Sequence, residues 1–179
     1  MPTPEKTSIR RIVLAGCELL EAGGQQGLTM QRVAERVGVQ APSLYKHVRD
    51  RAALLTAVAD AGIDDLATRL EQTDGSLEEL IREYRRFAQD RPEGFRLLLS
   101  SHASADALAH AAAPMLRATR AITGDREALQ AARLVTAWAT GFIEMELSDA
   151  FRLGGDVDEA FAYGLTRLRR ALTDHGRQM

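Results

Sequence analysis

The clearest chemistry in this sequence lies in a short run of polar side chains within its first third. The run carries amide, hydroxyl, phenol, amine and imidazole groups at Gln40, Ser43, Tyr45, Lys46 and His47. Short polar groups can form hydrogen bonds with base edges in the DNA major groove, and a flexible lysine can neutralise phosphate charge. The run is therefore typical of a surface that recognises double-stranded DNA.

No residues in the sequence have the spacing of a catalytic or metal site. The histidines His47, His102, His110 and His175 are dispersed, and neither a Gly-rich phosphate loop nor a nucleophile elbow occurs. His102 and Asp106 lie four residues apart and could meet on a helix, but such a pair is more often solvated than metal-bound. We therefore expect no enzymatic activity, no metal and no cofactor.

Two short helices joined by a tight turn would position the polar run. Helices at 30–37 and 41–48 must cross steeply, which needs a small residue at the crossing, Ala34, and a residue that can take positive φ in the turn, Gly38. The apolar residues that must bury on both sides are Val33, Val37, Val39, Leu44 and Val48. An ordinary helical hairpin is the alternative, but the joint pattern favours a helix-turn-helix.

The same segment resembles the DNA-binding domain of the TetR family. The resemblance covers about residues 7–60, and its motif is Thr29-Met30-x2-Val33-Ala34-x3-Gly38-Val39-x-Ala41-Pro42-Ser43-Leu44-Tyr45-Lys46-His47-Val48, followed by Arg51-x2-Leu54-Leu55. Gln40 stands where the family commonly has Ser or Thr, and Val48 stands where it commonly has Phe. Because Gln is a poorer N-cap than Ser, we expect a loose first turn in the second helix of the motif.

The resemblance implies roles for individual residues. Thr29, Tyr45 and Lys46 would contact phosphates, and residues 40–43 would face base edges. The candidate DNA-binding residues are Thr29, Gln31, Gln40, Ala41, Pro42, Ser43, Tyr45, Lys46 and His47. Lys6, Arg10 and Arg11 could reach flanking phosphates, or could simply be solvated.

Bulky apolar side chains are concentrated in the second half of the chain. They would either fill a helical core or line a pocket for a small effector. The candidate pocket residues are Tyr84, Phe87, Phe95, Leu98, His102, Met115, Trp138, Phe142 and Met145, with Arg96, His102, Thr140 and Glu144 as polar groups that could orient a ligand. This half resembles a TetR subgroup that carries a Trp-x2-His-Gly element. Here Thr140 replaces the His, so the ligand contacts of that His are not carried over to this chain.

The last two predicted helices carry more apolar residues than one buried stripe needs. A two-fold pair of such helices would bury the excess in a four-helix bundle. The candidate dimer residues are Ile143, Leu147, Phe151, Phe161, Leu165 and Leu168. Two recognition helices spaced ~34–36 Å apart could then read palindromic operator DNA. The resemblance implies a homodimeric repressor that is released by a small apolar or amphipathic effector.

Composition and periodicity predict an all-α protein. Aromatic residues make up only 5% of the chain, and Ala and Leu dominate its apolar set. We expect helices at 7–22, 30–37, 41–48, 51–70 after a cap at Asp50, 77–89, 92–99, from Pro114 to about Ile122, 126–153, and from a cap at Asp156 to about Leu172, with the ends within 100–113 left unassigned. The expected division is a DNA-binding domain at 1–50, a connecting helix at 51–72 and a ligand-binding and dimerisation domain at 73–179.

Charge and cysteine content agree with this interpretation but do not decide it. The net charge is -2, with +2 on residues 1–60 and -4 on the remainder, a small asymmetry of the sign expected for N-terminal DNA binding. The single cysteine, Cys17, is expected to be a core residue and fits a reducing cytoplasm. No apolar run reaches the ~18 residues of a membrane span. The alternatives are a ligand-binding or scaffold protein that keeps the motif for structure, and a helical enzyme.

Overall fold

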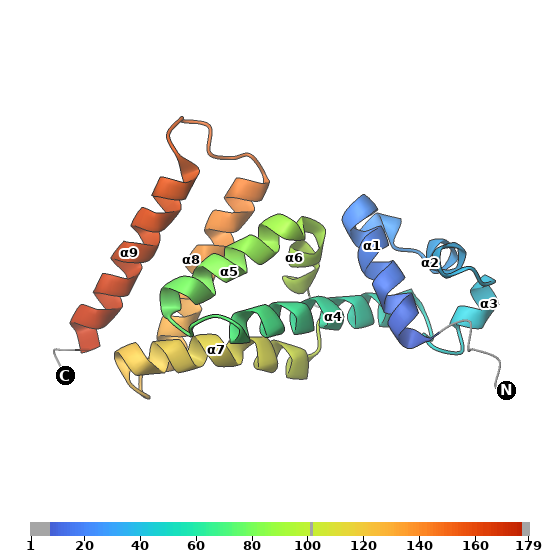
Figure 1. Cartoon of the computed structure of the whole chain (residues 1–179), viewed down its shortest axis with the longest axis horizontal. Helices are drawn as coiled ribbons and strands as arrows, with labels where there is room; N and C mark the ends of the chain where they lie inside the picture. The colour runs from blue at the N-terminus through green and yellow to red at the C-terminus, as the bar shows by residue number, and fades with distance from the viewer. Residues whose placement is uncertain (1–7, 101, 177–179) are drawn as a thin grey trace. The chain divides into compact units, whose positions relative to one another are not determined.

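The computed structural model describes residues 8–100 and 102–176, and its regular elements are helices (Figure 1). Their bounds are α1 Ile9–Gly27, α2 Met30–Val37, α3 Ala41–Leu44, α4 Arg51–Glu71, α5 Leu77–Asp90, α6 Pro92–Leu98, α7 Ala105–Thr123, α8 Ala128–Leu147 and α9 Val157–Gly176. The predicted all-α class is confirmed. Lys6, one of the candidate phosphate contacts, lies outside the described residues. None of the helices in the described ranges is long and apolar enough to cross a membrane.

The chain folds into two compact units that alternate along the sequence. The first unit contains the described residues up to Asp65 together with Arg91–Ala109, and the second contains Leu66–Asp90 and the described residues from His110 onward. The helix α6 therefore belongs to the first unit, whereas the sequence-based division assigned it to the C-terminal domain. The functional division at 1–50, 51–72 and 73–179 stays a prediction.

The first unit has its core between α1, α2, α3 and the N-terminal half of α4. The residues that fill it include Ile12, Leu20, Leu28, Val33, Leu44, Leu54, Val58 and, from α6, Leu97, each at most 2% exposed. Gly16 allows α1 and α4 to approach closely, since a Cβ there would lie 2.6 Å from Cγ2 of Val58. Cys17 packs beside this core, and burial raises the pKa of its thiol, which fits the expected role as a small core residue.

Several predicted helix boundaries differ from the structure: α1 is interrupted at Gly23 and Gly24 but continues to Gly27, and α9 continues to Gly176. Pro114 lies inside α7 instead of starting it, because the Ala-rich stretch before it has high helix propensity and the burial of Pro114, Met115 and Ala118 offsets the unfavourable effect of an interior proline. The helix α8 ends at Leu147 rather than at residue 153, because Asp149 takes a left-handed φ of 51° before the glycine pair is reached. The helix α3 ends at Leu44, where the sequence predicted a helix through Val48.

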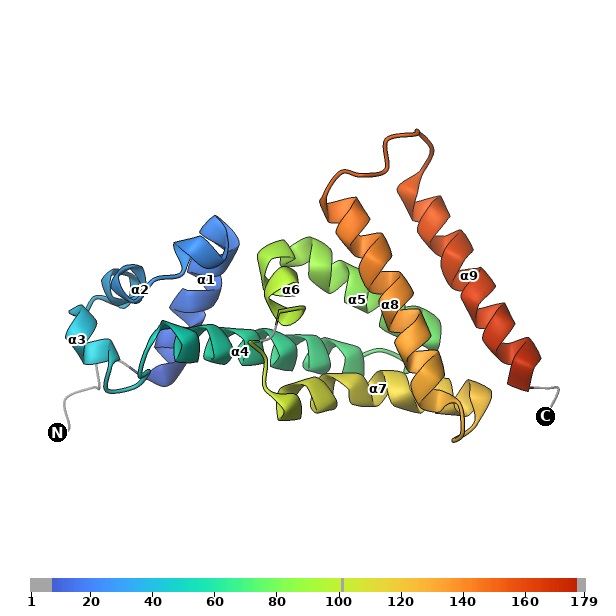
Figure 2. The same cartoon turned by 180° about the vertical axis from the view of Figure 1, so that it is seen from behind.

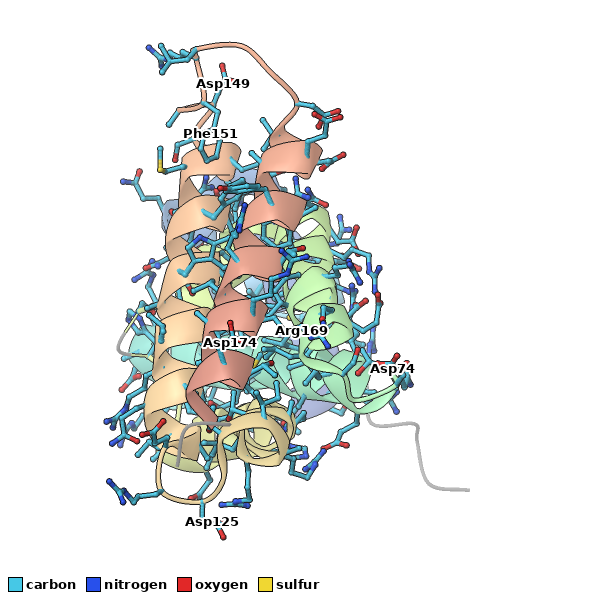
Figure 3. All side chains as sticks on the ribbon, turned by 90° about the vertical axis from the view of Figure 1, so that its left-hand side faces the viewer. Asp74, Asp125, Asp149, Phe151, Arg169 and Asp174 are labelled. Carbon is cyan, nitrogen blue, oxygen red and sulfur yellow. The ribbon has the colours of Figure 1, made fainter. Side chains whose placement is uncertain are left out.

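The second unit is built around α5, α8 and α9, and α8 and α9 run side by side (Figure 2). Aromatic rings join these two helices. The ring centroids lie 5.3 Å apart for Trp138 and Phe161, and 5.2 Å apart for Phe142 and Phe161. Phe151, in the loop after α8, folds back to 4.7 Å from Phe142 (Figure 3). The structure thus joins two candidate pocket residues and two candidate dimer residues in one aromatic cluster.

Ion pairs tie the helices of the second unit together. Arg85 of α5 donates to both carboxylate oxygens of Glu146 of α8, at 2.8 and 2.6 Å, and pairs with Asp158 of α9 at 2.7 Å. Arg169 of α9 reaches Glu78 of α5 at 2.6 Å, and its position is visible in Figure 3. Because Arg85 and Glu146 are largely shielded from solvent, this pair fixes the position of α8 against α5 more firmly than an exposed pair would.

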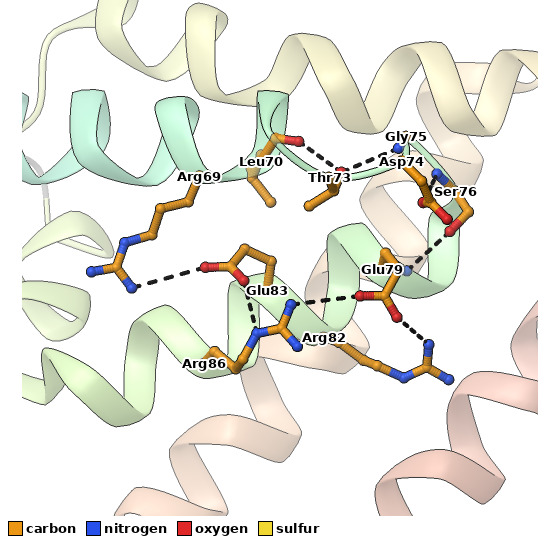
Figure 4. Close-up of polar contacts among 10 residues, drawn as sticks. All are labelled: Arg69, Leu70, Thr73, Asp74, Gly75, Ser76, Glu79, Arg82, Glu83 and Arg86. Atoms are coloured by element: carbon orange, nitrogen blue, oxygen red, sulfur yellow. Dashed lines mark hydrogen bonds and ion pairs between the residues drawn. The ribbon is translucent and has the colours of Figure 1, made fainter.

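The junction of α4 and α5 is held by a local polar network (Figure 4). Asp74 accepts a hydrogen bond from the N–H of Ser76, whose hydroxyl in turn caps α5 by accepting from Glu79. Along α5, Arg86 lies 2.8 Å from Glu83 and 3.5 Å from Glu79. This turn lies at the predicted break at residues 72–76. The charged side chains beside this turn, such as Arg86, Glu83 and Glu79, pair with one another. This pattern indicates that they stabilise the connection between α4 and α5.

Candidate nucleic-acid interface

The turn between α2 and α3 has the geometry that the sequence predicted. Thr29 caps α2, since its hydroxyl accepts a hydrogen bond from the N–H of Arg32 at 3.2 Å. Gly38 ends α2 with φ 78° and ψ 35°, a left-handed conformation that favours glycine. The N–H of Val39 then bonds to the carbonyl of Ala34 at 3.0 Å. These local contacts turn the chain sharply into α3.

A substitution at Gly38 separates backbone strain from side-chain crowding, because a Cβ there would meet no atom within 4 Å. We expect Gly38→Ala to lower the free energy of unfolding by about 1–2 kcal/mol and to weaken DNA binding, since the left-handed backbone disfavours alanine. Gly75→Ala is the matched control, because Gly75 has φ 76°, equally open space and a position in the α4–α5 loop. Denaturant unfolding and DNA titration of both variants measure the two effects, and equal DNA affinities would contradict this prediction.

The recognition helix α3 is a single turn, Ala41–Leu44, where the sequence predicted a helix through Val48. Gln40 makes no side-chain capping hydrogen bond, as its poor capping ability led us to expect. Residues 45–47 continue as a turn, and the N–H of Val48 still bonds to the carbonyl of Leu44 at 2.9 Å. The first turn of a helix is costly to form, and α3 has no side-chain cap to stabilise it, which agrees with its ending at Leu44.

Most candidate DNA-binding residues are accessible on the first unit. Gln31, Gln40, Pro42, Tyr45, Lys46 and His47 are exposed, and Thr29, Ala41 and Ser43 are half-buried. Tyr45 is 54% exposed although it is a large aromatic residue. The amide of Gln31 donates to Glu35 at 3.0 Å, so this side chain is held along α2. The structure therefore brings all nine candidates onto α2, α3 and their flanking residues.

The arginines of the first unit divide into different roles that the sequence did not reveal. Arg11 donates to the carbonyl of Val37 at the end of α2, and Arg32 donates to the carbonyl of Gly27 at the end of α1. Arg51 donates to the carbonyl of Leu28 at 2.9 Å and to that of Gln25. Arg36 pairs with Glu18. These guanidinium groups stabilise helix ends and packing.

Lys46 differs from these arginines. It is exposed and forms no ion pair with any other described residue, and it directly follows Tyr45 at the end of α3. Asp50, which accepts a hydrogen bond from the N–H of Ala53 at 2.7 Å, begins α4 behind it, and this backbone hydrogen bond lowers the pKa of the Asp50 carboxyl. Asp50 therefore caps the start of α4. Lys46 is thus an exposed cation at the end of the helix-turn-helix, with no ion pair among the described residues.

Two family models match the chain. The model described as "Bacterial regulatory proteins, tetR family" matches residues 6–58, and the model described as "Tetracyclin repressor-like, C-terminal domain" matches residues 77–168. The second match alone covers more than half of the chain. The chain belongs to the TetR family. The protein is accordingly a DNA-binding transcriptional regulator of a non-enzymatic family. In the described residues no group of three or more His, Cys, Asp or Glu could hold a metal ion.

Individual relatives agree with this assignment to the TetR family. The chain is 29% identical over 171 residues to the tetracycline repressor class A from transposon 1721 of Escherichia coli, covering 91% of this chain and 78% of that one. It is 36% identical over 91 residues to the class G repressor of Vibrio anguillarum, covering 51% of this chain but only 40% of that protein. A solved structure of a TetR variant from Acinetobacter baumannii AYE in complex with minocycline superposes with TM-score 0.68 at 29% identity, covering 89% and 93% of the two chains.

The candidate pocket residues of this TetR protein are distributed over both units. Phe95, Leu98 and His102 lie in the first unit, and Tyr84, Phe87, Met115, Trp138, Phe142 and Met145 lie in the second. Phe87 and Phe95 are fully buried, whereas Met145 is 46% exposed. Arg96 pairs with Glu93, and His102 Nδ1 lies 2.7 Å from the hydroxyl of Ser100. These two polar candidates therefore already have partners within the first unit.

The other two polar candidates lie on α8, close to Tyr84 of α5. The hydroxyl groups of Tyr84 and Thr140 form a 3.0 Å hydrogen bond. Burial raises the pKa of the Tyr84 phenol; the hydrogen bond with Thr140 lowers it, and the negative charge of Glu144 raises it again. Glu144 follows Thr140 by four residues on α8, so both lie on one face of that helix. The structure brings these three candidates together within the second unit.

The candidate dimer residues are partly used inside the chain. Ile143, Phe161 and Leu165 are at most 3% exposed in one protomer, while Leu147, Phe151 and Leu168 are half-buried. The predicted dimer set left out four exposed apolar residues on the same two helices, Leu129, Leu134, Tyr163 and Met145, the last of which was assigned to the pocket. Helical spacing could have flagged them, but exposure depends on how α8 and α9 pack. Tyr163 also lies under the guanidinium of Arg167, 5.1 Å from the ring centroid.

Proposed function

We propose that the protein is a ligand-responsive repressor that binds palindromic operator DNA as a homodimer and releases it when a small effector binds. The carrying observation is the helix-turn-helix, in which Gly38 turns the chain and leaves Tyr45 and Lys46 exposed. Phosphate contacts from Thr29, Tyr45 and Lys46 would position this motif in the major groove. Base contacts from residues 40–43 would supply sequence preference.

Dimerisation is proposed through α8 and α9. One recognition helix of a single turn reads few bases, and a two-fold pair doubles the number of base pairs that are read. The exposed faces of α8 and α9, which carry Leu134, Met145 and Tyr163, offer apolar surface for a partner. Leu147, Phe151 and Leu168 are half-buried and would be covered further, and buried Ile143, Phe161 and Leu165 would support the interface from beneath.

An effector is proposed because the related A. baumannii structure is a complex with minocycline. In the resembling subgroup a Trp-x2-His-Gly element lies in the C-terminal domain, and this chain carries Trp138 and, three residues later, Gly141 in that region. Thr140 replaces the His, so the effector of this protein would meet a hydroxyl instead of an imidazole. Effector and operator binding would be coupled reciprocally, typically by ~1–3 kcal/mol, with α4 as a helix that contributes to both units.

Selection of binding sites from random DNA, followed by titration of the selected site, tests this proposal. We expect a palindrome whose half-sites lie one helical turn apart, two protomers per site by sedimentation, and an affinity at least 10³-fold above that for random DNA. Recovery of no preferred sequence, or a protein that remains monomeric at micromolar concentration and on DNA, would count decisively against a dimeric operator-binding repressor.

A further inference from the structure

A buried carboxylate oxygen on α8 has no hydrogen-bond donor within the described chain. This atom is Oε1 of Glu144. Polar atoms in protein interiors are almost always paired, because an unpaired one loses its hydration without compensation. The unpaired oxygen of Glu144 can therefore accept a hydrogen bond from a donor group on a bound ligand.

Glu146, the next acidic residue along α8, has a carboxylate whose two oxygen atoms both accept hydrogen bonds. Glu146 accepts from Nε and Nη2 of Arg85 and from the amide of Gln89 at 2.9 Å. The two residues share a helix and a side-chain type, and both are half-buried. General burial of acids on α8 therefore does not explain the unpaired oxygen of Glu144.

Two further oxygen atoms lie beside this carboxylate. Thr140 precedes Glu144 by one helical turn, and its hydroxyl is 3.0 Å from the hydroxyl of Tyr84. Because residues four apart on a helix share a face, the hydrogen bond between Tyr84 and Thr140 and the position of Glu144 on α8 place the three groups in one neighbourhood between α5 and α8. Each hydroxyl can accept a hydrogen bond in addition to the one that joins the pair. The neighbourhood thus offers three acceptors and one negative charge.

We propose that Glu144, Thr140 and Tyr84 form the head-group site of the effector, and that the effector is a protonated amine or amidine with an apolar body. This inference rests on the proposed effector response and names the chemical class of the ligand. An ammonium group has three donors and no acceptor, which matches three acceptor oxygens and one carboxylate charge. Leu147 follows Glu144 by three residues on the same face of α8 and is half-buried, so it could contact the apolar body of the ligand. A carboxylate ligand would be repelled by Glu144, and a neutral alcohol would leave its charge unpaired.

The test uses three probes with one apolar chain and different head groups: n-octylammonium, n-octanol and n-octanoate, all below their aggregation concentrations. Calorimetry with the full-length protein measures binding, and the fluorescence of Trp138, the single tryptophan of the chain, reports occupancy near the site. We expect octylammonium to bind about 10-fold or more tightly than octanol, and octanoate to bind most weakly, because charge-assisted hydrogen bonds are the stronger ones. In Glu144→Gln the ammonium preference is expected to disappear while octanol affinity stays within about twofold.

Glu146→Gln is the matched control, since it neutralises an acid on the same helix that is already paired with Arg85 and Gln89. This variant is expected to keep the preference for the ammonium head group, and thermal unfolding verifies that both variants are folded. Equal wild-type affinities for octylammonium and octanoate would overturn the proposal. So would a Glu144→Gln variant that retains the preference, or one in which only thermal stability changes.

A separate operator titration distinguishes this site from the proposed regulatory function. Octylammonium that binds through Glu144 but leaves operator affinity unchanged refutes the effector response and retains the cation site. Operator release by a ligand whose affinity is insensitive to Glu144→Gln refutes the cation site and retains the response.

Discussion

Lys46→Ala is expected to weaken DNA binding by about 60-fold at 0.1 M salt and to make the log-log salt slope shallower by about 1.8. Each phosphate contact contributes about 0.9 to that slope, and a dimer would lose two contacts. Lys46 is the appropriate residue to change because it is exposed and makes no ion pair with other described residues, so its removal should not destabilise the fold. Titrations of operator and random DNA at several salt concentrations measure both quantities.

The charge-matched control is Arg82→Ala. It also removes one positive charge, but from α5 of the second unit, where Arg82 pairs with Glu79 at 2.6 Å. It should leave the salt slope unchanged. Ser43→Ala provides the complementary result, since a residue that faces base edges should change sequence preference with little change in slope. A Lys46→Ala variant with the wild-type slope would show that this side chain does not contact phosphate.

The helix-turn-helix could be predicted from sequence because its requirements are local. The cap at Thr29, the left-handed turn at Gly38 and the cap at Asp50 each involve atoms within about four residues along the chain. The length of α3 was overestimated because helical spacing continues through Val48 although the cap is missing. In the same unit, Arg11 and Arg51 bond to carbonyls 26 and 23 residues away, and no sequence pattern distinguishes them from cations that await DNA.

The second unit was harder to predict because core, pocket and interface select the same residue types. Phe87 and Met145 were grouped together from sequence, yet one is fully buried and the other is 46% exposed. Trp138 and Phe161 were assigned to different surfaces, yet their rings stack. Whether such a residue lies in the core, in a pocket or at an interface is decided only by the packing of α8 against α5 and α9. The polar residues were more informative, since Thr140 and Glu144 were singled out as ligand-orienting candidates and lie beside Tyr84.

The close packing of Gly164 against Trp138 leads to a second large expected effect, from the addition of one methyl group. Gly164 of α9 faces the indole of Trp138, and a Cβ at this position would lie 2.4 Å from Cζ2 of the ring. The indole cannot move away easily, because it stacks on Phe161 and touches Phe142 at a centroid distance of 5.8 Å. We expect Gly164→Ala to lower the free energy of unfolding by about 1–3 kcal/mol through overpacking, although alanine favours helix.

Urea unfolding followed by circular dichroism and by Trp138 fluorescence measures this change. Gly141→Ala provides the opposite case, since a Cβ at Gly141 of α8 would meet no atom within 4 Å, and alanine should add about 0.5–1 kcal/mol of stability there. Trp138→Phe in the Gly164→Ala background should recover most of the loss, because the smaller ring vacates the position that the new methyl group needs. Additive effects of these two substitutions would mean that crowding against the indole is not the cause, and that α8 and α9 are held apart by other contacts.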